Sequence, residues 1–437
     1  MQSRKPFPNL YFGWYIVAAG WGMQILMGAL MFQAYGSYAA VMREEFGWSK
    51  TMFSAAFSMS QAESAVLGPV QGRLIDRFGP RIVSQIGVVI FGGGFMLFSQ
   101  VESQWSFFAA FFVVALGAAL TGFMSFTIAI VNWFERRRST ALGIMLTGLA
   151  VGGLIVPAVV VSLEQFGWRD TAFGSGVIII AVGLPLTLVL RHRPEQYGYE
   201  VDGMSLEERD AQRRVPLATH EFTAREALRT PAFWFLSLGH ASALLVVSAV
   251  LVHMVLHVNE NLGYSLGTAG AITALLTASM IVGLLGGGGF GDRVSKRALI
   301  VGCMAGHTSG LLLLAYATNL WMVALFAILH GTAWGTRAPV LQSIRADYFG
   351  RAAFGTITGL STFISLLGMM AGPIVAGVLA DKTGGYELGF TLLAIVAGVG
   401  AIFFFFARPP KPPVRRVGSS DEEYQGLPAI NERNLAT

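Results

Sequence analysis

Long apolar segments are the feature that most constrains how this chain can fold. Of its 437 residues, 54% are hydrophobic and 13% are charged, which is about half the charged fraction of a typical soluble domain. The apolar residues gather into twelve segments, each close to the roughly 20 residues that a helix needs to cross a bilayer. Their approximate limits are residues 11–33, 50–71, 82–101, 105–132, 140–163, 171–190, 232–258, 264–290, 298–317, 320–343, 353–379 and 387–407. The sequence therefore predicts an all-α membrane protein with twelve transmembrane helices.

A short motif occurs twice in the chain, about half a chain apart. Residues 72–81 read GRLIDRFGPR and residues 288–297 read GGFGDRVSKR, so that Asp76 and Asp292 are 216 positions apart. Further matches at separations of 215 to 217 are Phe134 with Phe349, Pro157 with Pro373, and Phe173 with Phe390. A repeat of this length in a membrane chain predicts two pseudo-symmetric six-helix bundles, the layout of a secondary transporter.

These features divide the chain into four expected parts. Residues 1–190 form the first six-helix bundle and residues 232–407 the second, and residues 191–231 make a polar linker between them. Within the linker Ser205, with Glu208 three residues later, is typical of a helix start, so we expect a short surface helix there. The tail 408–437 begins with prolines and then becomes charged, which predicts disorder.

The basic residues are distributed unevenly between the two sides of the expected membrane. With the N-terminus placed in the cytoplasm, 25 of the 30 basic residues lie on that side, four lie outside, and Arg337 lies within a span. This asymmetry predicts that both termini are cytoplasmic. It also accounts for the sequence pI of about 9.4, so nucleic acid is not an expected partner. The first apolar run is too long for a cleavable signal peptide, and none is expected.

Glu63 and Arg337 are the two formally charged residues that lie well inside the predicted spans. Each costs roughly 2.5–3.5 kcal/mol on insertion scales, so such residues normally face a cavity and have a partner. The equivalent positions in the other half are near Ser279 and Gly122, which are uncharged. The scaffold therefore does not require these charges, which favours a role in function. The alternative is a structural ion pair that joins the two bundles.

The expected substrate site centres on Arg337, because a planar guanidinium can bind a carboxylate through two hydrogen bonds. His330 lies seven residues earlier and so on the same helix face, where it could bind substrate or relay a proton; a buried histidine with a purely structural role is an equal alternative. Trp334 would flank this site, and Gln24 of the first span could line the pathway. Glu63 is the candidate for proton coupling, since it would accept a proton whenever Arg337 turned to the substrate.

The repeated motif has a mechanical interpretation. Asp76 can cap or pair with a neighbouring helix and so close an inner gate. The residues assigned to this gate are Gly72, Asp76, Arg77, Arg81, Asp292 and Arg293. A role as topology determinants alone would explain the arginines but not Asp76 or the repeated glycine.

Other kinds of chemistry find little support in the sequence. His253 and His257 have the spacing of metal ligands on one helix face, but no third ligand is evident, so a polar lining of the outer vestibule is the preferred interpretation. We see no phosphate-binding loop and no nucleophile triad. Neither an enzyme nor a cofactor is expected, and ATP use is not expected.

The motif at 72–81 resembles the signature that follows the second helix in the major facilitator superfamily, and the resemblance extends over residues 10–407. Finer features resemble the bacterial oxalate/formate antiporter and monocarboxylate porter branch: 192–198 (HRPEQYG), 226–234 (EALRTPAFW), 167–169 (GWR) and 346–350 (ADYFG). The resemblance implies a twelve-helix transporter of small carboxylates in the bacterial inner membrane, working with protons or by exchange. The arginine that this branch usually carries in the eighth helix is missing, and Leu284 lies near its position.

The sequence thus predicts a secondary transporter for a small organic anion, a monocarboxylate or dicarboxylate, by proton symport or anion exchange. The many aromatic and methionine residues leave open a second transporter function, efflux of a larger amphipathic compound. A different class of function is a membrane sensor that uses the same scaffold without transport.

Overall fold

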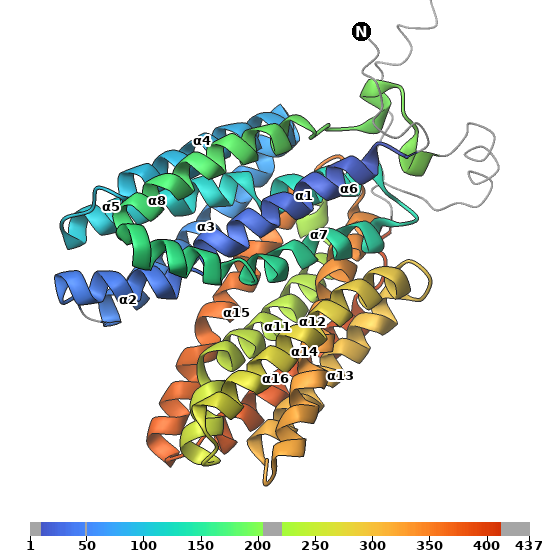
Figure 1. Cartoon of the computed structure of the whole chain (residues 1–437). Coiled ribbons are helices and arrows are strands. Elements are labelled where there is room, and N and C mark those ends of the chain that lie inside the picture. Colours follow the sequence, from blue (N-terminus) through green and yellow to red (C-terminus); the bar gives the residue numbers. More distant parts are fainter. Residues whose placement is uncertain (1–9, 49, 204–220, 412–437) are drawn as a thin grey trace, which may run out of the picture.

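The computed structural model describes residues 10–48, 50–203 and 221–411 (Figure 1). The expected helix after Ser205, and the tail beyond residue 411, lie outside these described residues. The described part is helical throughout, which confirms the all-α prediction.

The N-terminal half begins with a long bent segment and continues with straighter helices. Its elements are α1 (Gly13–Met27), the π-helical turn η1 (Gly28–Phe32), α2 (Tyr35–Phe46), α3 (Lys50–Phe78), α4 (Pro80–Phe98), α5 (Gln104–Thr121), α6 (Phe123–Trp133), α7 (Arg138–Gly153) and α8 (Val156–Leu188). Two short 3-10 turns, η2 (Pro194–Tyr197) and η3 (Val201–Gly203), follow in the linker.

The C-terminal half begins with a five-residue helix, α10 (Ala224–Leu228). The longer elements after it are α11 (Pro231–Leu256), the π-helical turn η4 (His257–Asn261), α12 (Leu266–Gly291), α13 (Lys296–Ala315), α14 (Leu320–Phe349), α15 (Phe354–Thr383) and α16 (Glu387–Phe406). Side-chain caps explain several of the starts, since Thr230, Ser265 and Asn319 each accept a hydrogen bond from the first turn that follows.

Helix length and apolarity confirm the prediction of twelve spans. Nine helical runs among the described residues are long and apolar enough to cross a membrane. One of them, Arg138–Leu188, contains two spans, because Gly167 has a φ of 78° and breaks α8. The more polar helices α3 and α14, of 29 and 30 residues, complete the set.

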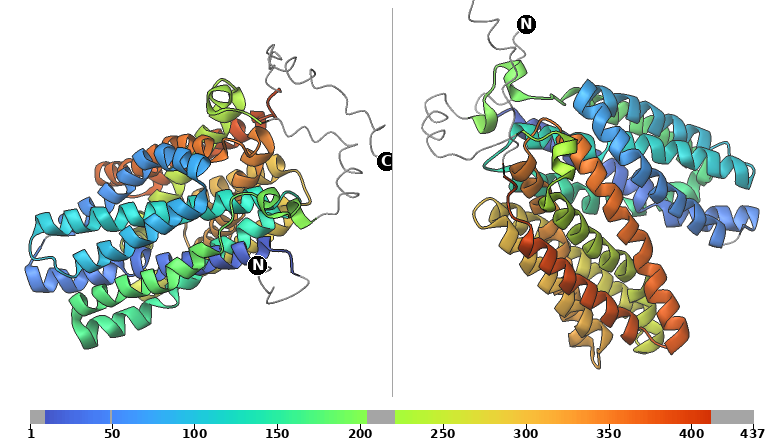
Figure 2. Two further views of the ribbon diagram at one scale, coloured as in Figure 1. Left: turned by 90° about the horizontal axis from the view of Figure 1, so that it is seen from above. Right: turned by 180° about the vertical axis from the view of Figure 1, so that it is seen from behind.

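Buried apolar side chains form two clusters. One consists almost wholly of residues between Ile16 and Leu190, and the other lies between Phe222 and Ala407. Figure 1 shows the corresponding groups of helices, α1–α8 and α11–α16, which meet near the linker and diverge away from it. The view from behind in Figure 2 shows the same arrangement. We call the end where the groups meet the linker side and the opposite end the far side.

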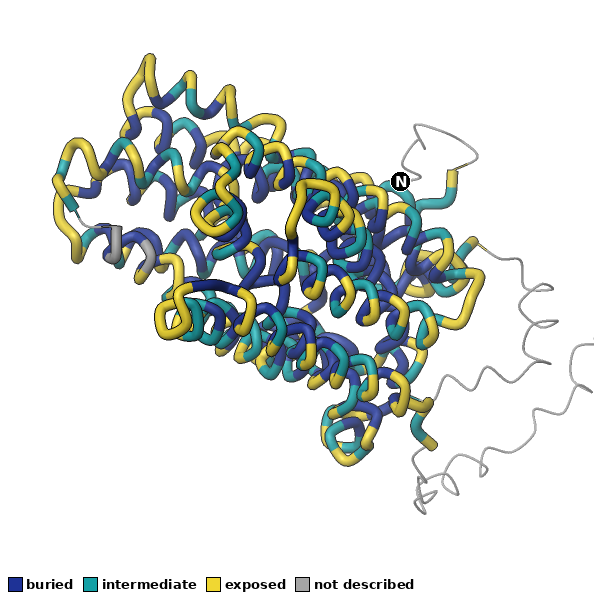
Figure 3. The backbone as a smooth tube through the Cα atoms, turned by 90° about the horizontal axis from the view of Figure 1, so that it is seen from below, coloured by how far each residue is buried: buried dark blue, intermediate teal, exposed yellow. Residues whose placement is uncertain are grey.

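The outer surface of both groups is strongly apolar. Val282 and Ile374 are each 65% exposed, which suits side chains that face lipid. In Figure 3 the exposed residues lie on the outside of the helices, and the buried residues lie within and between them. The surface is therefore that of a multi-pass membrane protein.

Candidate functional site

Asp76 joins the two halves on the linker side. It lies in the last turns of α3, and its carboxylate accepts hydrogen bonds from the first turn of α15. Oδ1 accepts from the backbone N–H of Gly355 at 3.1 Å, and Oδ2 accepts from the backbone N–H and the hydroxyl of Thr356 at 2.8 and 2.7 Å. The residue that precedes α15, Ala353, provides no side-chain cap. Asp76 therefore satisfies free backbone donors at the positive end of a helix in the other half.

Asp292 makes the same arrangement where α12 meets α7. We call the contact of α3 with α15 and the contact of α7 with α12 the two seams between the halves. The Asp292 carboxylate accepts hydrogen bonds from the backbone N–H of Ser139 at 2.9 Å and from the N–H and hydroxyl of Thr140 at 3.0 and 2.7 Å. The helix that begins here, α7, also has no cap of its own, because Arg137 precedes it. Ser139 and Thr140 lie 216 positions before Gly355 and Thr356. The repeat seen in the sequence thus produces two equivalent contacts between the halves.

Glycines allow the seams to close. In the seam of α3 with α15, a Cβ on Gly72 would collide with the backbone of Gly355, and one on Gly359 would collide with Gly68. In the seam of α7 with α12, a Cβ on Gly288 would lie 3.0 Å from the Ser139 carbonyl oxygen. Close backbone contact of this kind requires residues without side chains. The gate prediction included Gly72 as part of the repeated motif, and the structure places it in the seam.

Further polar contacts surround the two aspartate caps. Arg138, which is 3% exposed, pairs with Asp347 of α14 at 2.6 Å, and Lys296 pairs with the same carboxylate at 2.5 Å. Arg351 donates to the Asn132 carbonyl oxygen at 2.7 Å. All of these contacts lie on the linker side, so the described conformation is closed there.

The arginines of the repeated motif lie outside these contacts. Arg77, Arg81 and Arg293 are exposed, and the guanidinium of Arg77 lies 5.2 Å from the ring centre of Phe78. The two aspartates and the glycines are therefore the motif residues that contact the opposite half.

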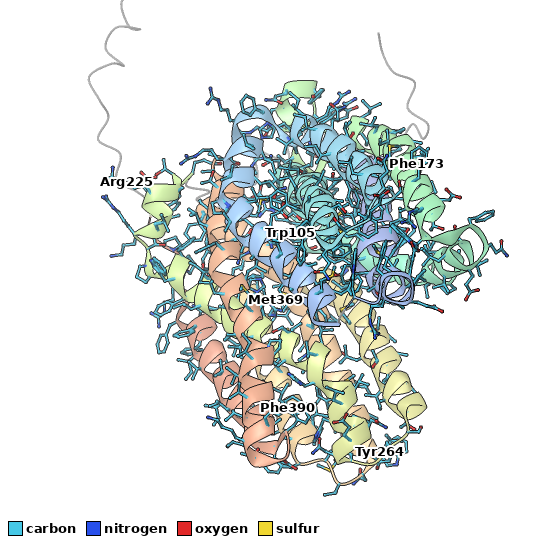
Figure 4. The ribbon with its side chains drawn as sticks, turned by 90° about the vertical axis from the view of Figure 1, so that its left-hand side faces the viewer. Trp105, Phe173, Arg225, Tyr264, Met369 and Phe390 are labelled. Atoms are coloured by element: carbon cyan, nitrogen blue, oxygen red, sulfur yellow. The ribbon has the colours of Figure 1, made fainter. Side chains whose placement is uncertain are left out.

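A small cavity lies between the halves, beyond the closed seam. Its volume is about 160 Å³. It is lined by Met27, Met31, Phe32, Ser60, Gln61, Ser64, Gly68, Gln71, Ala115, Ala118, Ala119, Phe123, Met124, Thr362 and Leu366. Figure 4 shows Met369 on α15 beside α3, where the amide of Gln61 contacts its sulfur at 3.6 Å. None of these lining residues is charged.

A buried cation lies in the C-terminal half. Arg337 of α14 is 1% exposed, and its Nη1 donates to Nδ1 of His240, on α11, at 2.5 Å. Because the guanidinium stays protonated, His240 must carry its own proton on Nε2. His240 is itself partly exposed.

A second arginine lies in the same helix. Arg345 is 1% exposed and donates to the Ser361 hydroxyl of α15 at 2.6 Å and to the Gln342 amide oxygen at 3.3 Å. It lies eight residues after Arg337 in α14. Neither arginine has a carboxylate within ion-pairing distance among the described residues, and the Nε–H group of each lacks an acceptor there.

His330 points to another helix of the same bundle. Its Nδ1 is 3.1 Å from Nδ1 of His307 on α13, and both rings are fully buried. One ring must donate and the other accept in this pair. Trp334, one turn further along α14, is partly exposed and packs at the edge of the C-terminal core. The structure thus pairs His330 with His307 and Arg337 with His240.

In the N-terminal half Glu63 is buried without a partner. It is 8% exposed, and neither carboxyl oxygen has a hydrogen-bond donor within the described part of the chain. It does not pair with Arg337, whose contact is His240. Gln24 is also buried, and it packs against α7 where Gly148 leaves room for it. The ion pair considered as an alternative for Glu63 and Arg337 is absent from the described contacts in this conformation.

The histidines near the far side are engaged with the backbone. Nε2 of His253 lies 2.9 Å from the Pro373 carbonyl oxygen, and its Nδ1 lies 3.1 Å from the Tyr386 hydroxyl. Nε2 of His257 lies 3.0 Å from the Leu314 carbonyl oxygen. No group of three or more metal-ligating side chains occurs among the described residues.

Sequence reasoning missed three further residues of the arginine and histidine group around Arg337 and His330. These are His240, His307 and Arg345, and the last of them lies just beyond the predicted limit of the tenth span at residue 343. The 215-residue separation of Phe134 and Phe349 was the available signal. Both residues end a helix that reaches the linker side, so the match placed Arg345 within α14.

Comparison with known proteins identifies the family. The family model of the Major Facilitator Superfamily matches residues 20–290 and 236–431. The chain therefore belongs to this superfamily of membrane transporters, as the sequence motif indicated, and not to a family of enzymes.

Its relatives are distant and varied. An "MFS-type transporter" of Gibberella moniliformis is 25% identical over 425 residues, which cover 93% of this chain and 94% of the relative. The membrane sensor protein UhpC of Salmonella typhimurium is 26% identical, with 84% and 85% of the two chains covered. The oxalate:formate antiporter of Oxalobacter formigenes is 25% identical, with 97% of both chains covered.

Solved structures support the fold. The proton:xylose symporter XylE aligns with a TM-score of 0.72 over 92% of this chain and 97% of that one, at 14% identity. The architecture is therefore that of a major facilitator transporter. At these identities the comparisons establish the superfamily and not a particular branch within it.

Proposed function

We propose that this secondary transporter carries a small organic anion, a monocarboxylate or dicarboxylate, by proton symport or anion exchange. The supporting observation is the pair of buried arginines, Arg337 and Arg345, without a carboxylate partner among the described residues. Burial of a cation without a counter-ion is costly. A substrate carboxylate would supply the missing charge and the missing hydrogen-bond acceptor.

His240 provides a route by which substrate would reach Arg337. The histidine occupies one N–H group of the guanidinium as a neutral acceptor. A carboxylate would be the stronger acceptor for the same group, because both partners are then charged. We infer that substrate replaces His240 at Arg337, and that Trp334 and the polar residues of the cavity contact the rest of the molecule.

Glu63 is the proposed proton site. A carboxylate buried without a donor would be strongly disfavoured, whereas a carboxylic acid is not. We therefore assign the protonated form to the described conformation, in which the linker side is closed. The side chain would release its proton after the bundles rearrange and its surroundings change.

The proposed cycle uses alternating access. The two aspartate caps would hold the linker side closed, and their release would open it while the far side closes. The distribution of basic residues supports a cytoplasmic linker side, with both termini in the cytoplasm. In a bacterium this orientation belongs to the inner membrane.

A ligand screen by thermal unfolding tests the substrate class. Purified protein is heated with formate, oxalate, lactate, malonate and succinate, and with uncharged compounds of similar size. We expect at least one carboxylate to raise the melting temperature of the wild type and of Lys382→Gln, an exposed control that loses the same charge. Arg337→Gln should lose that shift. Protection that is equal in Arg337→Gln and wild type would remove Arg337 from the site.

The lining of the cavity favours one alternative. Met27, Met31 and Met124 lie beside aromatic side chains there, and methionine surfaces adapt to varied apolar ligands. Efflux of an amphipathic compound is thus the second candidate. Protection by hydrophobic amphiphiles and not by any carboxylate would favour it. Ligand binding without transport in vesicles would instead favour a sensor.

A further inference from the structure

A groove crosses the seam between α3 and α15 on the linker side. Its volume is about 430 Å³. Its walls are Pro69, Val70 and Arg73 of α3, Ala224, Arg225 and Leu228 of α10, and Thr356 and Leu360 of α15. Because the walls come from both halves of the chain, the groove is complete only while the seam is closed.

The charges of the groove have one sign. Arg73 and Arg225 line it and are both exposed, and no acidic residue is part of its lining. Figure 4 shows Arg225 at the edge of the molecule, on the short helix beside the first turns of α11. In the second copy of the repeat Gly289 takes the place of Arg73. The scaffold closes that seam without the cation, so Arg73 is not needed for closure itself.

The groove lies at the level where a membrane surface is expected. Trp234, at the start of α11, is 45% exposed, and its indole N–H donates to the Leu228 carbonyl oxygen at 2.9 Å. Tryptophans of this kind are typical of the boundary between lipid tails and headgroups. Val70, 52% exposed, lies on α3 to the membrane side of Arg73. The groove thus combines cations at the interface with an apolar wall below them.

We propose that this groove binds an anionic phospholipid. The phosphate lies between Arg73 and Arg225, and an acyl chain follows Val70 and Leu360. Because the lipid contacts both halves at once, it binds the conformation in which the seam is closed and stabilises that conformation. Lipid composition would therefore set the balance between the two states of the transporter, independently of which substrate is carried.

Native mass spectrometry of the purified full chain tests the binding. The protein is offered phosphatidylglycerol and phosphatidylcholine in equal amounts. We expect the wild type to retain one phosphatidylglycerol molecule preferentially. The double variant Arg73→Gln/Arg225→Gln should lower that retention by roughly 30-fold, the effect of about 1 kcal/mol for each arginine. The control Arg229→Gln, an exposed arginine outside the groove, should retain the lipid.

A second arm tests the dependence on the seam. Asp76→Asn weakens the contact between α3 and α15, so we expect it to retain less phosphatidylglycerol although both arginines remain. Melting curves in detergent verify that each variant is folded. Equal retention by the double variant and Arg229→Gln would overturn the proposal, and so would equal retention of the two lipids by the wild type. Displacement by free glycerol 3-phosphate would identify a soluble anion as the occupant instead.

Discussion

Three buried ionisable residues carry the proposed site at the residue scale. Arg337 and Arg345 lack acidic partners within the described chain, and Glu63 lacks a basic one. A protein that needed these charges only for stability would pair them with one another, because breaking a buried ion pair is strongly destabilising. Their separation is consistent with the proposed roles, in which the arginines bind an anion and the glutamate a proton.

Replacement of Arg337 separates a binding role from a structural one. Arg337→Gln removes a buried cation that has no counter-ion, so we expect a melting temperature equal to or above that of the wild type without substrate. Carboxylate binding should be abolished, and Arg337→Lys should restore little, because the planar fork is lost. Calorimetric unfolding and ligand titration measure the two effects. A large fall in stability with normal binding would assign Arg337 to the framework.

Replacement of Glu63 tests the proton site. Glu63→Gln copies the neutral carboxylic acid in shape and charge, so the variant should fold with nearly unchanged stability. We expect it to exchange substrate across vesicle membranes but to lose accumulation driven by a pH gradient. Proteoliposomes with and without the gradient measure this. Normal gradient-driven accumulation in Glu63→Gln would exclude Glu63, and His330 with its partner His307 would become the next candidate.

The aspartate caps are equivalent by the repeat, so their variants should behave alike. Asp76→Asn and Asp292→Asn each remove a charge from a helix N-terminus, an interaction worth about 0.3–2 kcal/mol. We expect each single variant to slow transport by up to roughly tenfold and the double variant to slow it further. Substrate should still protect all three against heat. Loss of that protection in a folded variant would contradict a gating role.

At the scale of helices, the seams depend on contact between backbones. A Cβ on Gly355 would lie 2.6 Å from Oδ1 of Asp76 and 2.7 Å from the Gly72 carbonyl oxygen. Gly355→Ala should therefore hold α3 and α15 apart and reduce transport at least as much as Asp76→Asn. Gly93 of α4 has no atom within 4 Å of its Cβ position, so Gly93→Ala is the matched control. An equal transport rate in Gly355→Ala and Gly93→Ala would contradict the proposed seam.

The same scale separates what the sequence could predict from what it could not. The twelve spans follow from apolar length, which a bilayer dictates directly. The 216-residue repeat identified both aspartates and Gly72, because symmetry constrains their environment in each half. The partners of Arg337 and His330 could not be predicted from the sequence. His240 and His307 lie on other helices, and the rotation of each helix about its axis depends on the whole bundle.

The extra length of the first span was also missed. The segment Gly13–Phe46 is 34 residues long, whereas an end near residue 33 was predicted. The π-helical turn Gly28–Phe32 and the helix Tyr35–Phe46 extend it on the far side. The predicted apolar segment stopped near residue 33 because polar residues follow it. In the structure Glu45 accepts hydrogen bonds from Trp168 and Arg169 at 2.5 Å each. A contact between distant segments stabilises this extension, and periodicity within one segment does not reveal it.

For the whole molecule, the two halves meet at equivalent seams but differ in chemistry. The repeat supplies two equivalent contacts between the halves, whereas the buried arginines, Glu63 and the groove beside Arg73 have no counterpart in the repeat. Arg337, Arg345 and their histidines lie in the C-terminal half, and Glu63 lies in the N-terminal half. Rotation of one half against the other would thus change the surroundings of the proposed anion site and of the proposed proton site together.

Transport of a labelled carboxylate into proteoliposomes tests this account most directly. Vesicles loaded with the carboxylate that protects best against heat are diluted into a trace of the labelled compound, and uptake is followed for the wild type, Arg337→Gln and Lys382→Gln. We predict rapid uptake by the wild type and by Lys382→Gln, and uptake at the level of empty vesicles for Arg337→Gln. Carboxylate uptake by Arg337→Gln at the wild-type rate would contradict the proposal that this buried arginine binds the transported anion.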